Sequence, residues 1–259
     1  MSTIIYPSPI FGPVHSRRLG VSLGINLMPA DGKICSFDCI YCECGFNADH
    51  RPTQPRPSRT EVAEQLRVKL TEMAADGIQP DVLTFAGNGE PTAHPDFPGI
   101  IDDTIALRDQ LAPKAKVSVL SNATFIHAEK VRQALLRVDN NILKLDTVCP
   151  EYIRAVDRPV SQHYDVEKII ADMEKFDGHI IIQTLFMKGI THGFDTDNTS
   201  MAYVQPWIDA LRRIRPSEVM IYTIDRETPD HHLLKATHED LDRICRLVED
   251  AGFHCTASY

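Results

Sequence analysis

The sequence predicts an α/β fold with a parallel sheet, and three observations lead to this prediction. Segments with the residue pattern of strands alternate six times with segments that have the pattern of helices. Hydrophobic residues make up 43% of the 259 positions, which is enough to fill a core. Six such units are too few for a closed eight-stranded barrel, so the alternation suits an open partial barrel or a doubly wound flat sheet.

The expected strands are short apolar runs bounded by polar or turn-forming residues. In chain order they span residues 21–27, 81–86, 116–120, 141–145, 179–187 and 218–224. The expected helices follow these strands and carry apolar residues at helical spacing. In chain order they span residues 58–75, 97–111, 128–136, 166–176, 201–214 and 238–251.

The first and the last of these helices have the clearest local signals. Ser58 and Glu61 have the Ser-x-x-Glu spacing of a capping box, which predicts where the first helix begins. The apolar stripe of that helix consists of Val62, Leu66, Leu70 and Met73. The stripe of the last helix consists of Leu241, Ile244 and Val248. Both stripes repeat every three or four residues, as expected of helices that pack on a sheet.

Charge and cysteine content indicate the compartment and the partners. The formal net charge is -9, which is a poor match for the phosphates of nucleic acid. The arginine-rich stretches at residues 17–18, 51–59 and 212–215 are expected to be solvated surface, so nucleic acid is not a favoured partner. Seven cysteines without a secretory signal favour a reducing compartment, and no apolar run reaches the roughly 18 residues of a membrane helix. We therefore expect a cytoplasmic protein that is not embedded in a membrane.

Four cysteines lie within ten residues, in the sequence Cys35-Ser-Phe-Asp-Cys39-Ile-Tyr-Cys42-Glu-Cys44. The first three have the spacing C-x3-C-x2-C, and three thiolates can hold three irons of a 4Fe-4S cluster while the fourth iron stays open. The alternative is a zinc site with Cys44 as fourth ligand. Because a single residue separates Cys42 from Cys44, placing both on one ion is strained, and the spacing favours the cluster.

A second polar segment follows the strand expected at residues 81–86. Gly87, Asn88 and Gly89 precede Glu90 in the sequence Gly-Asn-Gly-Glu-Pro. Ligands of α/β sheets bind beyond the C-terminal ends of the strands, and glycine lets the backbone approach a ligand closely. We therefore expect this segment to contact a ligand, with a simple turn as the alternative.

The cysteine spacing and the Gly-Asn-Gly-Glu-Pro segment together resemble the radical SAM enzymes. In that family the open iron is chelated by S-adenosylmethionine (SAM), and an electron from the reduced cluster cleaves SAM to a 5′-deoxyadenosyl radical that abstracts hydrogen from a substrate. The resemblance implies an open six-unit βα barrel, a 4Fe-4S cluster held by Cys35, Cys39 and Cys42, and SAM. It also implies one core domain over residues 1–259, with an N-terminal extension at 1–20 and the cluster loop and connector at 33–57.

The same resemblance implies SAM contacts at particular residues. Tyr41, directly before the third cysteine, is expected to border the adenine. Gly89 and Glu90 are expected to hold the methionyl ammonium. Ser121 and Asn122 are expected to contact the ribose hydroxyls or the methionyl carboxylate, and a helix N-cap is the alternative for both.

Later strand ends supply further candidates. In the Lys-Leu-Asp segment, Lys144 is expected to pair with the SAM carboxylate and Asp146 to bind the ribose. Alternation along the strand puts these two side chains on one face, so a plain ion pair is the alternative. Gln183 lies in the middle of its strand and is expected to point inward, while Asp225 and Arg226 are candidates for substrate contact at the barrel mouth.

Residues 13–26 resemble a subgroup of radical SAM enzymes, often labelled iron–sulfur oxidoreductases, that is related to the wyosine-forming tRNA enzymes. This chain departs from those tRNA enzymes in one respect, because they carry an additional set of cysteines. Here Cys149, Cys245 and Cys255 are scattered, and we expect buried free thiols that behave as small hydrophobic residues. A second cluster built from Cys44 and these three is the less favoured alternative.

The resemblance also implies partners. An electron donor such as flavodoxin or ferredoxin would reduce the cluster, and the substrate would be RNA, a peptide or protein, or a metabolite. Little sequence follows the sixth unit to cover the mouth, so we expect a wide lateral opening that suits a large substrate or a partner subunit. The rival hypothesis is a zinc-stapled binding module with the same fold and no redox chemistry.

Overall fold

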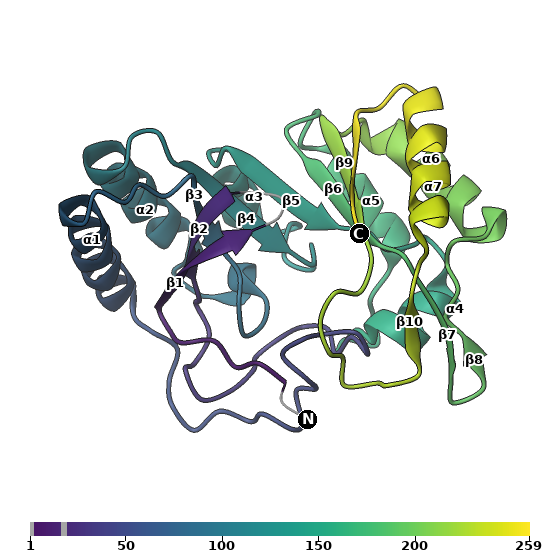
Figure 1. Cartoon of the computed structure of the whole chain (residues 1–259), viewed down its shortest axis with the longest axis horizontal. Coiled ribbons are helices and arrows are strands. Elements are labelled where there is room, and N and C mark those ends of the chain that lie inside the picture. The colour runs from purple at the N-terminus through teal and green to yellow at the C-terminus, as the bar shows by residue number, and fades with distance from the viewer. Residues whose placement is uncertain (1–2, 17–19) are drawn as a thin grey trace.

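One curved sheet holds the six predicted strands side by side (Figure 1). The structure is a computed structural model that describes residues 3–16 and 20–259. Within these ranges the main sheet has eight strands in the spatial order β1-β2-β3-β4-β5-β6-β9-β11. Their bounds are β1 Ile10–Ser16, β2 Gly20–Ile25, β3 Val82–Phe85, β4 Lys116–Ser121, β5 Asn140–Lys144, β6 Ile181–Leu185, β9 Glu218–Tyr222 and β11 Cys255–Ser258. From β2 to β11 each neighbouring pair is parallel.

The structure adds one strand at each edge of the predicted set. The segment expected to be an N-terminal extension contains β1, which pairs antiparallel with β2. At the other edge β11 pairs parallel with β9. Neither strand was predicted, because Gly12 and Pro13 interrupt β1 and because β11, Cys-Thr-Ala-Ser, lacks the large apolar residues that marked the equally short β3. Arg17 and Arg18, part of the first arginine-rich stretch, lie outside the described residues.

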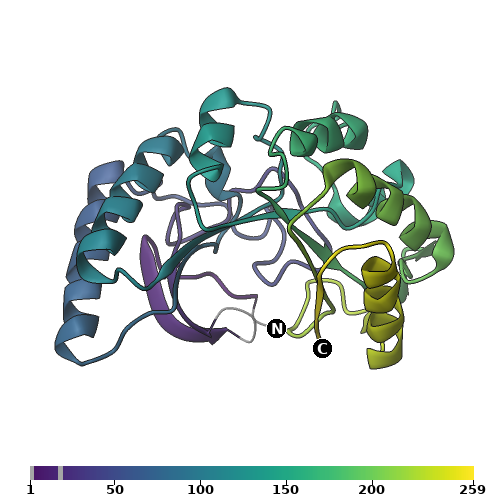
Figure 2. The same ribbon diagram turned by 90° about the horizontal axis from the view of Figure 1, so that it is seen from above.

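The predicted open barrel is confirmed, because the sheet curves into an arc whose two edges, β1 and β11, are far from closing it (Figure 2). All six predicted helices are present and cover the convex side of this arc. Their bounds are α1 Arg59–Ala75, α2 Phe97–Leu111, α3 Glu129–Leu135, α5 Val166–Glu174, α6 Met201–Ile214 and α7 His238–Asp250. The concave side is left to strand side chains and loops, and it is where the functional residues are found.

Shorter elements were not predicted. The apolar run expected at residues 179–187 divides into β6 and β7 (Met187–Thr191), and β7 joins β8 (Phe194–Asp195) and β10 (Leu233–Lys235) in a small sheet. Pro91–Ala93 forms the short helix η1. A helical turn, α4 (Pro150–Tyr152), continues into a π-helix, η2 (Ile153–Asp157). The small sheet lies at the same end of the molecule as the cysteine loop (Figure 1).

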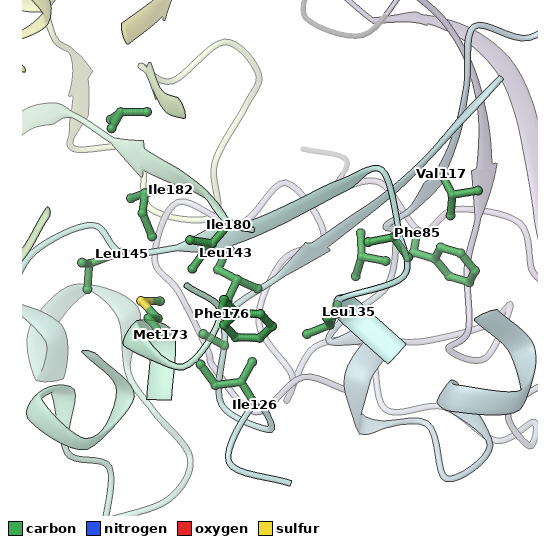
Figure 3. Close-up of a cluster of buried hydrophobic side chains, with 14 of the residues drawn as sticks. Phe85, Val117, Ile126, Leu135, Leu143, Leu145, Met173, Phe176, Ile180 and Ile182 are labelled. Atoms are coloured by element: carbon green, nitrogen blue, oxygen red, sulfur yellow. The ribbon is translucent and has the colours of Figure 1, made fainter. Parts of the chain in front are cut away.

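Alternation along each strand separates the core from the site. Phe85, Val117, Leu143 and Ile182 point to the convex side, where they pack against helix and loop residues such as Phe176 (Figure 3). Their strand neighbours Thr84, Ile142 and Gln183 point to the concave side and line a cavity there. Since side chains alternate with a period of two, each strand contributes both to the core and to the cavity wall.

The predicted capping box at the start of α1 is confirmed. The Ser58 hydroxyl accepts a hydrogen bond from the Glu61 N–H at 3.2 Å, and the Glu61 carboxylate accepts one from the Ser58 N–H at 2.6 Å. We expect Ser58→Ala to lower the free energy of unfolding by about 1 kcal/mol, measured by chemical denaturation. Ser200→Ala is the matched control, because Ser200 is the N-cap of α6 and its side chain makes no capping bond. An equal loss in both variants would contradict this account.

Among residues 3–16 and 20–259, none of the helices combines the length and the apolar content required to cross a bilayer.

Candidate metal and cofactor site

The loop between β2 and α1 carries the four clustered cysteines at the C-terminal end of the parallel strands. Cys39 and Cys44 are buried, and Cys35 and Cys42 are half-buried. The loop is attached to the segment after β3 by two backbone hydrogen bonds that flank Gly89. The Ile34 N–H donates to the Asn88 carbonyl at 3.0 Å, and the Glu90 N–H donates to the Ile34 carbonyl at 3.2 Å. The two motifs that the sequence analysis singled out therefore lie against each other.

Gly89 is required by this contact. Its φ is 141°, in a region that favours glycine, and a Cβ atom built there would lie 1.8 Å from the Ile34 carbonyl oxygen. From the sequence, these glycines are expected to allow a close approach to a ligand. In the structure the close approach at Gly89 is to the backbone of the cysteine loop, which this glycine positions.

Glu90 is buried and ties the end of β3 to the end of β4. Its carboxylate accepts hydrogen bonds from the Thr92 N–H at 3.0 Å, the Ser121 hydroxyl at 2.8 Å and the Asn122 N–H at 2.7 Å. Burial raises the pKa of Glu90, and these hydrogen bonds oppose that rise. The carboxylate thus orients the turn after β4.

Asn122 reaches from this turn to the cysteine loop. Its Nδ2 lies 3.6 Å from the Cys35 sulfur and 2.9 Å from the Ser36 hydroxyl. The alternative role of Ser121 and Asn122 as a helix N-cap is wrong, because α3 begins at Glu129, seven positions after Asn122, with Ala128 as its N-cap. Both side chains instead connect β4 to Glu90 and to the first cysteine.

Lys33 is a functional candidate that the sequence analysis missed. Its side chain is 1% exposed, and its ammonium donates to the Gly45 carbonyl at 2.5 Å and to the Cys42 sulfur. Burial opposes the charge, but Cys42, Cys35 and Cys39 together raise the pKa of Lys33. A lysine two positions before the first cysteine was the available signal, although its burial is not visible in the sequence.

The cysteines differ in their readiness to ionise. The pKa of Cys42 is lowered to about 6. The largest cause is a hydrogen bond with the Cys44 thiol. Burial opposes the lowering, and the charge of the nearby Lys33 adds to it. Burial raises the pKa of Cys35 to about 12, and burial also raises the pKa of Cys39. A buried ammonium beside three thiols fits a bound group that requires three thiolates, since it offsets their negative charge.

A hydrogen-bonded cluster of charged and phenolic groups adjoins the cysteine loop. The Tyr41 hydroxyl lies 2.6 Å from Asp146 Oδ2 and 2.7 Å from Asp157 Oδ1. Lys144 Nζ lies 3.4 Å from Asp146 Oδ2 and donates to the Tyr222 hydroxyl at 2.7 Å. The ion pair expected as the alternative for Lys144 and Asp146 is therefore present. Asp157, 116 positions from Tyr41, had no signal in the sequence.

A cavity of about 530 Å³ occupies the concave side of the sheet. Tyr41 and Cys42 line it, so one face of the cysteine loop opens onto this space. Gln183 also lines it and points inward as expected. Asp225 and Arg226 lie at the mouth, where the sequence analysis placed them.

At the cavity mouth Arg226 joins three segments of the chain. Its guanidinium donates to Glu43 Oε2 at 2.7 Å and to the Tyr6 hydroxyl. The Tyr6 hydroxyl in turn donates to Glu43 Oε1 at 2.9 Å. The N-terminal segment, the cysteine loop and the segment after β9 therefore meet here, and the charge of Arg226 is paired within the protein.

The remaining cysteines were expected to be buried, but they differ in burial. Cys255 is buried, but Cys149 and Cys245 are half-buried, and the Cys245 and Cys255 thiols share a hydrogen bond. Cys44 donates to the Gly87 carbonyl at 3.4 Å. Across residues 3–16 and 20–259, no three His, Cys, Asp or Glu side chains converge on a point suited to a single metal ion. A cubane cluster differs from such a site because each thiolate binds its own iron.

Comparisons with known proteins agree with this geometry. Residues 31–192 match the family model described as the radical SAM superfamily. A curated relative, a UPF0026 protein of Helicobacter pylori strain J99, is 31% identical over 84% of this chain. The chain spans 66% of the length of that relative.

Solved structures show the same fold at low sequence identity. A radical SAM methyltransferase from Sphaerobacter thermophilus aligns with 92% of this chain and 66% of its own, with a TM-score of 0.67 and 14% identity. A structure of TYW1 with a lysine–pyruvate adduct bound covers 88% of this chain and 73% of its own, with a TM-score of 0.61 and 13% identity. These structures confirm the predicted fold, and the family model confirms the resemblance to the radical SAM enzymes.

Proposed function

The chain belongs to the radical SAM superfamily of enzymes, and from this premise we propose that Cys35, Cys39 and Cys42 hold a 4Fe-4S cluster that binds SAM. A cluster bound there would supply the electron that cleaves the sulfonium of SAM, for hydrogen abstraction from a substrate. The observation that carries the proposal is the placement of the cysteine loop. Gly89 anchors it, Lys33 offsets its charge, and Cys42 faces the concave cavity.

The residues around the loop are proposed to orient SAM. Gly89 and Glu90 would receive the methionyl ammonium next to the first cysteine, and Ser121 and Asn122 would contact the ribose or the carboxylate. Asn122 lies close enough to Cys35 to act beside the cluster. Tyr41 and Gln183 line the cavity and would border the nucleoside.

Lys144 suits an electrostatic role in this site. Burial opposes its charge, but Asp146 and the Tyr222 hydroxyl raise the pKa of Lys144, so the amine is held as an ammonium. An ammonium cannot attack a carbonyl, whereas it can pair with the carboxylate of SAM. We assign Lys144 to that pairing and Asp146 to a ribose hydroxyl.

The cavity supports a substrate that is not a nucleic acid. Arg226 is paired with Glu43 and Asp225 with Lys235, and Glu227 adds negative charge to the lining. In the part of the chain that the structure describes, the mouth of the cavity therefore has no unpaired arginine to attract phosphates, and the Glu227 carboxylate would repel them. A peptide, a protein segment or a neutral metabolite fits this lining better, and the open side of the arc leaves room for a large substrate. Flavodoxin or ferredoxin is proposed as the electron donor.

The test is to purify the protein without oxygen and incubate it, reduced, with SAM and deuterated cell fractions. We expect deuterium to appear in 5′-deoxyadenosine with the fraction that contains the substrate. Brown protein with iron and acid-labile sulfide is expected, at about four irons per chain for one 4Fe-4S cluster. Colourless protein with one zinc per chain and no SAM cleavage would instead support the zinc-stapled binding module.

A further inference from the structure

Two buried carboxyl groups share a single phenol beside the cysteine loop. Asp146 and Asp157 are 6% and 4% exposed. The Tyr41 hydroxyl is within hydrogen-bond distance of one oxygen of each. A phenol has one proton to donate, so it can satisfy only one of the two contacts as a donor. A second proton on the carboxyl pair is needed, since two ionised carboxylates here would repel each other without screening by water.

The surroundings indicate which carboxyl group is neutral. Asp146 Oδ1 accepts a hydrogen bond from the Leu185 N–H at 2.8 Å, and its Oδ2 lies 3.4 Å from the Lys144 ammonium. The carboxyl of Asp157 bonds to the Tyr41 hydroxyl and to Asp146. Burial and the neighbouring Asp146 carboxylate raise the pKa of Asp157. Asp157 is therefore the protonated member: it donates to the Tyr41 hydroxyl, which donates in turn to Asp146.

The backbone around Asp157 also holds the cysteine loop by hydrogen bonds. The Asp157 and Arg158 carbonyls both accept a hydrogen bond from the Asp38 N–H at 3.1 Å. The Ile40 N–H donates to the Val156 carbonyl at 3.0 Å. These carbonyls are available because η2 is a π-helix that ends at Asp157, and Arg158 follows in the left-handed conformation with a φ of 51°. The segment thus presents the Asp157 side chain to Tyr41 and to Asp146, which follows β5, while its backbone holds the loop.

We propose that Asp157 is a positioning residue of the SAM site, which as a neutral hydrogen-bond donor fixes Asp146 and Tyr41 in the orientation that receives the nucleoside of SAM. This inference rests on the proposed function. It extends that function because it assigns a role to a residue outside the cysteine loop and the strand ends. Tyr41 lines the cavity, whereas Asp146 and Asp157 do not, so Asp157 acts on SAM through Tyr41.

The test compares Asp157→Asn with Asp157→Ala in anaerobically reconstituted protein. Asparagine keeps a neutral donor beside Tyr41 and Asp146, whereas alanine leaves both without this partner. At equal iron content we expect Asp157→Asn to bind SAM within about threefold of the wild type and Asp157→Ala to bind at least about tenfold more weakly. SAM affinity would be measured by equilibrium binding. The change that SAM causes in the electron paramagnetic resonance spectrum of the reduced cluster is a second readout.

Two further variants serve as a matched control and as a substitute for Asp157→Ala. Asp172→Asn is the matched control, because Asp172 is a buried carboxyl on α5, paired with Lys175 on the convex side, and its change should leave SAM binding unaltered. If Asp157→Ala fails to hold a cluster, Tyr41→Phe removes the shared hydroxyl without a change of volume at Asp157 and should also weaken SAM binding.

Three results would overturn the inference. Unchanged SAM binding in Asp157→Ala or in Tyr41→Phe would show that the shared hydrogen bonds do not position the site. Equal losses in Asp157→Asn and Asp157→Ala would show that the neutral donor is wrongly assigned. A wild-type protein that forms a cluster but binds no SAM would overturn the proposed function first, and the inference with it.

Discussion

Replacing any one of Cys35, Cys39 and Cys42 by alanine is expected to abolish reductive cleavage of SAM. Each thiolate is proposed to hold one iron, so a cluster that loses one ligand no longer presents a single open corner to SAM. The expected loss of 5′-deoxyadenosine formation under reductant is at least about a thousandfold, and the iron content should fall with it. Product formation would be measured by chromatography of quenched anaerobic reactions.

Cys44→Ala is the matched control for these three variants. Cys44 is 2% exposed and lies in the same loop, but its thiol hydrogen-bonds the Gly87 carbonyl and the Cys42 sulfur. We expect it to retain most of the SAM cleavage activity, with a moderate loss because the Cys42 thiolate loses one hydrogen bond. Equal loss in all four variants would show that the set of metal ligands is different from the one proposed.

Gly89→Ala is expected to have the largest effect of any single glycine substitution near the site. The added Cβ would meet backbone atoms of Ile34, at 1.8 Å from its oxygen and 2.5 Å from its carbon, and backbone atoms cannot move aside as a flexible side chain can. We expect the free energy of unfolding to fall by about 3 kcal/mol. We also expect less iron per chain after reconstitution, because the cysteine loop must shift.

Gly77→Ala is the control that distinguishes the backbone strain of a positive φ from the steric clash with Ile34. Gly77 also has a positive φ, of 70°, but a Cβ atom there would have nothing within 4 Å. Its expected cost is about 1 kcal/mol, with iron content unchanged. Chemical denaturation of both variants and an iron assay decide the comparison. If Gly89→Ala loads iron like the wild type, the proposed packing between the two motifs is incorrect.

The fold was largely predictable because its signals are local. Capping residues and apolar spacing near Ser58 marked α1, and the runs around Val117 and Val219 marked interior strands. The segments that were missed lack such signals. β1 contains Gly12 and Pro13, β11 has no large apolar residue, and η2 has no period that the sequence reveals.

The site was predictable in part. The positions of Cys35, Cys39 and Cys42 and of Gly89 are recognised from spacing, because neighbours in sequence are neighbours in the loop. The surroundings of Glu90 could not be predicted from spacing, because its hydrogen-bond partners Ser121 and Asn122 come from the end of the next strand. The pairing of Lys144 with Asp146 was an open alternative until the structure placed both side chains.

The sequence by itself determined the α/β alternation, the cysteine spacing and the glycine-rich segment, because each depends on residues a few positions apart. Only the tertiary structure decided that Lys33 is buried beside the three thiols and that Asp157 shares a phenol with Asp146. The physical reason is that burial and long-range hydrogen bonds arise when distant segments close around one another. The charge state of a buried group then depends on which neighbours the fold supplies.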